Sequence, residues 1–139
     1  MLITDEQIAQ LVLSVRLLDQ AKVKELLHEV KETKIPLAEL LIQKDYISDE
    51  NLGMLIADAI KLPFVSLSKI SIPPEILEVV PEVVARKQKV LVFGRDEHGL
   101  KVAMADPANK QLRALIEKKS GEKIIPYYAT EHDIVSATK

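Results

Sequence analysis

The sequence predicts an α+β protein, in which an N-terminal all-helical tandem repeat of two helix pairs precedes a small α/β sandwich with a central β-hairpin. Three observations favour this fold class. Apolar residues alternate with a period of two between Lys89 and Pro107, the first sixty residues show helical spacing with capping residues, and those helices repeat after 29 residues. Because the helical and the alternating patterns occupy different parts of the chain, they predict segregated helices and strands.

The alternating stretch predicts two strands joined by a tight turn. Its inward positions are Val90, Val92, Leu100, Val102 and Met104, and the turn is Asp96-Glu97-His98-Gly99. We expect this hairpin to be the centre of the sheet. Asp106 and Pro107 then predict an N-cap and the first turn of a helix that ends near Gly121. Leu112, Leu115 and Ile116 are its expected inner face.

The first sixty residues predict four helices. Thr4 with Gln7 forms a capping box for the first helix, Asp19 caps the second, Pro36 begins the third and Ser48 caps the fourth. The apolar stripes are Ile8, Leu11, Val12 and Val15, then Val23, Leu26, Leu27 and Val30, then Leu37, Leu40 and Leu41, then Leu52, Leu55, Ile56 and Ala59.

These helix pairs form an internal repeat. Apolar residues align with apolar residues and caps with caps, as in Ile8 with Leu37, Val12 with Leu41 and Asp19 with Ser48. One copy alone leaves an apolar face uncovered, so we expect the copies to pack together. Leu13 and Ile42 lie roughly opposite their own stripes, and either the sheet part or a partner covers them.

We expect two subdomains, residues 1–60 and 61–139. Residues 64–67 predict a short edge strand after Pro63, and helices are expected over 73–80 and 81–88. A strand over 124–128 follows, and Thr130 with Asp133 caps a last helix.

Composition and charge exclude several classes of function. The chain has no cysteine, no phosphate-binding glycine loop and no apolar run long enough for a membrane helix. The N-terminus lacks signal-peptide regions, which predicts a cytoplasmic protein. Residues 1–60 carry 6 basic and 11 acidic side chains (net −5), and residues 61–139 carry 13 and 10 (net +3). The two parts therefore face different electrostatic surroundings.

No constellation of catalytic or metal-binding residues is evident. His28, His98 and His132 stand far apart, so we expect no catalytic residue, metal or cofactor. The basic residues of the second part are Arg86, Lys87, Lys89, Lys118, Lys119 and Lys123. We interpret them as solvated helix ends, and with no Trp and few aromatics to stack on bases we expect no nucleic acid partner.

The run from Leu62 to Thr130 resembles the N-terminal domain of the type II secretion ATPases and type IV pilus assembly ATPases. The resemblance rests on LPFVSL, P-E-x-x-A-R-K, V-A-M-A-D-P and the closing acidic helix after Thr130. The 29-residue repeat resembles the preceding helical region of that family, where two motifs of the form R-L-G-x-x-L-V-x-x-G-x-[ILV]-[ST] clasp cyclic diguanylate.

The resemblance implies a non-enzymatic docking or regulatory module, cytoplasmic or recruited to the inner membrane face, which couples a hexameric ATPase to the cytoplasmic domain of a platform protein. A cyclic dinucleotide receptor and a free-standing adaptor remain the alternatives. The docking residues we expect are Leu13 and Leu17. The arginine positions of the motif fall on Gln7 and Pro36, and its glycine positions on Ala9, Arg16, Ala38 and Asp45. We therefore predict that this copy has lost tight ligand binding, since a forked cationic donor is missing at both arginine positions.

Overall fold

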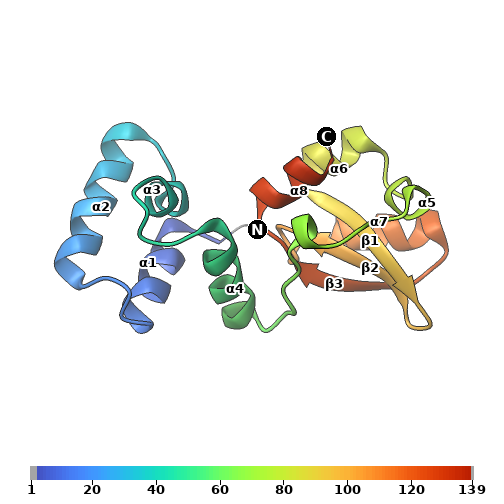
Figure 1. Cartoon of the computed structure of the whole chain (residues 1–139), viewed down its shortest axis with the longest axis horizontal. Helices are drawn as coiled ribbons and strands as arrows, with labels where there is room; N and C mark the ends of the chain where they lie inside the picture. Colours follow the sequence, from blue (N-terminus) through green and yellow to red (C-terminus); the bar gives the residue numbers. More distant parts are fainter. Residues whose placement is uncertain (1–2, 139) are drawn as a thin grey trace.

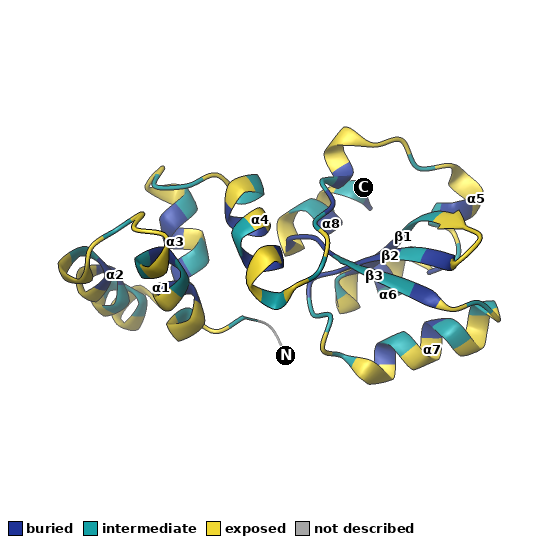
Figure 2. Cartoon of the chain, turned by 90° about the horizontal axis from the view of Figure 1, so that it is seen from below, coloured by how far each residue is buried: buried dark blue, intermediate teal, exposed yellow. Residues whose placement is uncertain are grey.

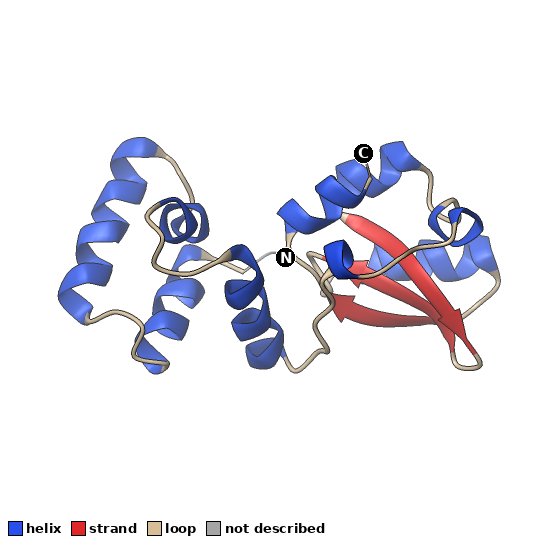
Figure 3. Cartoon of the chain, in the orientation of Figure 1, coloured by secondary structure: helices blue, strands red, loops and turns tan. Residues whose placement is uncertain are grey.

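The computed structural model describes residues 3–138, which form an α+β fold with four N-terminal helices followed by a three-stranded sheet and its covering helices (Figures 1 and 3). The predicted fold class is confirmed. The elements of the first part are α1 (Asp5–Ser14), α2 (Gln20–Thr33), α3 (Leu37–Gln43) and α4 (Asp49–Ile60). Those of the second are η1 (Leu67–Lys69), α5 (Pro74–Leu77), α6 (Glu82–Gln88), β1 (Val90–Asp96), β2 (Gly99–Met104), α7 (Lys110–Ser120), β3 (Ile124–Tyr128) and α8 (Glu131–Ala137).

The predicted helix caps of the first part are confirmed. Thr4 and Gln7 make both bonds of a capping box, and the side chains of Asp19 and Ser48 accept hydrogen bonds from the third residue of their helices. Two expected stripe positions are wrong, because Ala59 of α4 is exposed and belongs to no buried cluster, and Val15 is exposed as well. Val15 is the C-cap of α1 and is 46% exposed, because the helix ends before that position can turn inward.

The internal repeat appears in the backbone itself. Arg16 and Asp45, 29 residues apart, both adopt a left-handed conformation, with φ of 58° and 62°. In each copy the following residue donates its N–H to a carbonyl five residues back, Leu17 to Val12 and Tyr46 to Leu41, both at 3.0 Å. The two copies therefore share one helix–turn–helix geometry.

The sheet has the order β1-β2-β3. β1 and β2 form the predicted antiparallel hairpin, with a bulge at Phe93, and β3 lies parallel to β2. The expectation that the hairpin is the centre of the sheet is therefore wrong in detail. β2 is the central strand and β1 is an edge, because α7 carries the chain back to the far side of β2.

Alternate residues of the strands point to opposite faces of the sheet, and each face packs against a different set of elements. Val90, Val92, Val102 and Met104 belong to one cluster with Leu112 and Ile116 of α7 and with residues of α5 and α6. Leu91 and Ala103 belong to another cluster with Leu67 of η1 and Ile134 of α8. This period of two is the alternation that the sequence shows.

Three further expectations are wrong. The strand expected over residues 64–67 is reduced to a single parallel bridge between Phe64 and Tyr128. The Leu67 N–H donates its hydrogen bond to the Asp133 carboxylate and not to a neighbouring strand. Helix α7 begins at Lys110 rather than Pro107, since the Asn109 side chain caps it through the Leu112 N–H. Leu115 is 58% exposed, although its helix does end at Gly121 as predicted.

The helical core extends into the second part. Its buried members come from α1 to α4, and Tyr128 at the end of β3 joins them, with Phe64 packed against the cluster. Helix α4 lies between the other three helices and the sheet part in both views (Figures 1 and 2). The division into subdomains at residue 60 remains a prediction.

Candidate functional site

The positions of the tandem motif lie on α1, on α3 and in the turns that follow them. Gln7 is exposed, and its Oε1 accepts the Thr4 N–H at 2.9 Å, so the capping box already uses it. Pro36 is exposed and precedes α3, without a side-chain cap of its own. The Leu37 N–H donates a hydrogen bond to the Asp5 carboxylate of α1 at 3.0 Å. A carboxylate therefore stands where α3 begins, beside a position that the family pattern gives to arginine.

The glycine positions of the motif divide into two kinds. Ala9 is buried and Ala38 is half-buried, so both lie within the packing of the helices. Arg16 and Asp45 are exposed in the left-handed region, which glycine adopts without strain and other residues adopt at a cost. The pattern's second glycine thus coincides with a backbone that favours glycine.

The two residues expected to dock a partner differ in exposure. Leu13 is half-buried and packs against the helical core, and so does its repeat equivalent Ile42. Leu17 is 37% exposed and lines an open depression of about 400 Å³ with Leu18, Asp19, Ala21, Lys22 and Glu25. Of the pair, only Leu17 presents substantial apolar surface to solvent.

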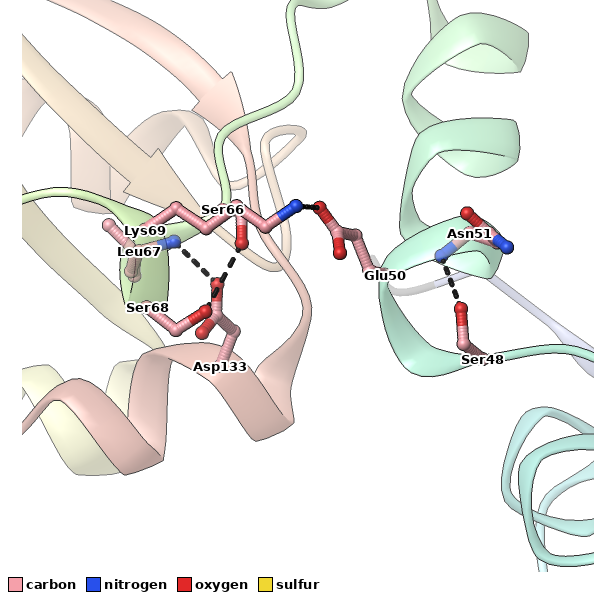
Figure 4. A network of polar contacts seen from close by, with 8 residues as sticks. All are labelled: Ser48, Glu50, Asn51, Ser66, Leu67, Ser68, Lys69 and Asp133. Carbon is pink, nitrogen blue, oxygen red and sulfur yellow. Dashed lines mark hydrogen bonds and ion pairs between the residues drawn. The ribbon is translucent and has the colours of Figure 1, made fainter.

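A polar junction fastens the start of α4 to the second part (Figure 4). Glu50 accepts a 2.7 Å bond from the Lys69 ammonium group. Asp49 accepts a bond of the same length from the Thr130 hydroxyl, which itself accepts the Asp133 N–H at 3.2 Å. Asp133 in turn holds the Leu67 N–H at 2.7 Å. Helix α4, η1 and α8 are thus linked through one set of hydrogen bonds.

Apolar contact closes the same junction. A Cβ added at Gly53 would lie 2.6 Å from Phe64 Cε1 and 2.9 Å from Thr130 Cγ2. Tyr128, buried beside them, has its pKa raised to about 12, first by burial and then by the negative charges of Asp49 and Glu131. The close approach at Gly53 requires a residue without a side chain.

The sequence alone does not predict this junction. The sequence predicts Thr130 and Asp133 only as a local cap. Asp49 and Glu50 lie in the first turn of α4, where acidic residues are common in any helix. The available signal was Gly53, the one glycine inside a predicted helix, where it lowers helix stability by about 1 kcal/mol relative to alanine. A glycine at such a position indicates a close neighbour.

Other chemistry is sparse in the described part of the chain. Among residues 3–138 no group of three or more His, Cys, Asp or Glu side chains is arranged to hold a metal ion. No helix within that range has the length and apolar character needed to cross a bilayer. Arg86 and Lys87 stand in the last turn of α6, and Lys118 and Lys119 in that of α7, so the helix-end interpretation of these four is confirmed.

Comparison with known proteins identifies relatives of the whole arrangement. The family model described as the MshEN domain matches residues 60–139. The type IV pilus assembly ATPase PilB of Thermus thermophilus is 26% identical over 131 residues, which cover 93% of this chain and 15% of that protein. The chain thus spans about a seventh of the length of this relative.

Solved structures share the fold along nearly all of the chain. The structure of MshE with cdg is 25% identical, with a TM-score of 0.72, and the match covers 94% of this chain and 95% of that one. The N-terminal domain of XpsE is 17% identical, with a TM-score of 0.64, and the match covers 97% and 94%. The resemblance predicted from the sequence is confirmed.

Proposed function

Because the chain belongs to the MshEN domain family, we propose that it is a non-catalytic regulatory and docking module of a type II secretion or type IV pilus assembly ATPase. In this role it couples the motor to the cytoplasmic domain of an inner-membrane platform protein. The module itself turns over no ATP, and it reaches the membrane face through its partner. The pilus ATPase among its relatives supports the assignment to this class of machine.

One observation carries the proposal. The helical part retains the repeat geometry, while the motif's arginine positions hold Gln7 and Pro36, which offer no cationic donor. The Asp5 carboxylate at the start of α3 adds a negative charge near Pro36. An anionic ligand would meet repulsion there, since like charges at close range oppose each other. The helical part is therefore better suited to binding a protein partner than to binding an anionic ligand.

The junction at α4 gives such a module a physical means of coupling. Thr130 and Lys69 of the second part hold consecutive residues of α4, and Gly53 lets Phe64 pack directly on the same helix. A force applied to the second helix pair would therefore be passed to the sheet part without a flexible linker. We propose that a partner docked on the helical part is coupled to the motor in this way.

The main alternative is a cyclic diguanylate receptor. The structural relative MshE with cdg favours it, because its fold covers 94% of this chain. A free-standing adaptor is the third possibility. The full-length gene tests it, because a coding sequence that continues beyond Lys139 into a phosphate-loop ATPase domain would exclude an adaptor.

Docking is tested by charge insertion at Leu17. We expect Leu17→Asp to keep the melting temperature and to weaken binding of the platform protein's purified cytoplasmic domain at least tenfold. Leu13→Asp should instead lower stability by about 2 kcal/mol, because Leu13 is half-buried in the helical core. Ser71→Asp, which adds the same charge to an exposed loop of the second part, is the matched control. Unchanged binding by Leu17→Asp would contradict docking through this surface.

A further inference from the structure

Helix α7 carries one apolar residue outside the core. Leu112 and Ile116 are 6% and 5% exposed in the cluster beneath the helix, whereas Leu115 is 58% exposed. Leu115 lies about 100° around the helix from Ile116 and about 60° from Leu112, so it stands at the edge of the buried face, where it is open to solvent. Figure 2 shows α7 at the rim of the molecule with its outer side exposed. We call the residues on this side the α7 outer face: Lys110, Gln111, Ala114, Leu115, Lys118 and Lys119.

The two charged residues that lie one helical turn from Leu115, Lys118 and Lys119, are both positive. The one acid of α7 is Glu117, whose carboxylate accepts the Ile124 N–H at 3.1 Å. Within residues 3–138 none of the ion pairs found involves Lys110, Lys118 or Lys119. A single exposed leucine is common on protein surfaces, but here two lysines without an ion pair, Lys118 and Lys119, lie three and four residues from it, and Lys110 adds a third positive charge at the start of the helix.

Helix stability explains only part of this arrangement. Lys118 and Lys119 lie in the last turn, where cations interact favourably with the helix dipole. Lys110 is the first residue of α7, where a cation is unfavourable, and the first turn contains no acid to offset it. Neither Lys110 nor Leu115 is explained by the stability of its own helix.

We propose that the α7 outer face is a second docking surface, which binds an acidic protein segment whose apolar side chain packs on Leu115. Charge complementarity selects the partner, because opposite charges steer approach and fix orientation. The helical part of this chain carries net −5, so a partner suited to it would be repelled by the α7 outer face. This inference goes beyond the proposed function, since it assigns a second partner of opposite charge.

Other macromolecules fit the face less well. Membrane association requires a larger apolar area than one leucine provides. Nucleic acid binding without aromatic stacking would depend on phosphate contacts alone, and α7 contains no aromatic residue. A protein segment matches both the leucine and the surrounding cations.

The test uses the intact chain and three probes. These are a labelled helical peptide with glutamates flanking one leucine, vesicles of phosphatidylglycerol and phosphatidylcholine, and a single-stranded DNA oligonucleotide. We expect the peptide to bind best, with affinity reduced at least fivefold by Leu115→Ser and at least tenfold by the double variant Lys118→Glu, Lys119→Glu. All three residues are exposed, and an unchanged thermal melt would show that the fold is retained.

Val83→Ser is the matched control. Val83 is 76% exposed on α6, beside Glu82 and Arg86, which pair with each other at 3.5 Å. This variant should leave peptide binding unchanged. The proposal is overturned if the peptide does not bind, if Val83→Ser weakens binding as much as Leu115→Ser, or if vesicles or DNA bind more tightly than the peptide.

Discussion

Replacing Gly53 with alanine should fail to stabilise the protein, although the change improves helix propensity. At an exposed helix position, glycine to alanine gains about 1 kcal/mol. At Gly53 the new methyl group would stand 2.6 Å from the Phe64 ring and 2.9 Å from the Thr130 methyl group. Overpacking of this kind costs about 1–3 kcal/mol. We therefore expect a net loss of about 0–2 kcal/mol and a loosened junction.

Denaturant unfolding of Gly53→Ala measures this loss. Asn51→Ala is the control, since Asn51 is exposed on the same helix and should gain a few tenths of a kcal/mol from propensity alone. Phe64→Leu combined with Gly53→Ala should recover part of the loss, which would appear as a coupling energy of at least about 0.5 kcal/mol in a double-mutant cycle. A gain of about 1 kcal/mol by Gly53→Ala alone would refute the tight junction.

Two further predictions concern the backbone and Tyr128. Arg16→Gly and Asp45→Gly should each raise the free energy of unfolding by up to about 1 kcal/mol, because both positions are left-handed and glycine is unstrained there; chemical denaturation measures the gain, and a loss in both variants would contradict it. Because the pKa of Tyr128 is raised from 10.0 to about 12 in the fold, the unfolded chain loses this proton first as the pH rises. Stability present below pH 10.0 should fall by roughly 1–3 kcal/mol between pH 10.0 and about 12. Parallel denaturation of Tyr128→Phe, which should lack this component, isolates it, and identical pH profiles would contradict the assignment.

Local features of the fold were predictable from the sequence because their causes are local. The capping residues Thr4, Asp19 and Ser48 act within one helical turn, and each does so in the structure. The alternation at Val90 and Val92 similarly reflects the pleat of one strand. The repeat can be recognised in the sequence because both helix pairs bury apolar residues at the same positions in the helical core.

Features set by distant residues were not predictable in this way. The strand expected over 64–67 was lost to Asp133, which lies 66 residues away from Leu67 and takes its N–H. The contact between Asp49 and Thr130 spans 81 residues, and neither residue type alone indicates it. Leu115 matched the helical period, but the period does not say how wide the covered face of α7 is.

For the candidate site, the residues at the motif positions can be read from the sequence, whereas the contacts around them cannot. Gln7 and Pro36 stand at the positions that the motif of the resemblance gives to arginine. The participation of Gln7 in a capping box was also predicted, since the spacing to Thr4 defines it. The Asp5 bond to Leu37 joins the two repeat copies across 32 residues, and only the fold brings it about.

The most direct test of the central claim is calorimetric titration of the chain with cyclic diguanylate. Each missing charge-assisted hydrogen bond costs about 1.5–3 kcal/mol, so the loss of two arginines costs roughly 3–6 kcal/mol, or about two to four decades of affinity. Arginine at 7 and 36 with glycine at 9, 16, 38 and 45 should begin to restore binding without altering the fold. For the unmodified chain we predict a dissociation constant in the millimolar range or weaker, whereas a value near or below micromolar, with the ligand in the helical part, would contradict the account.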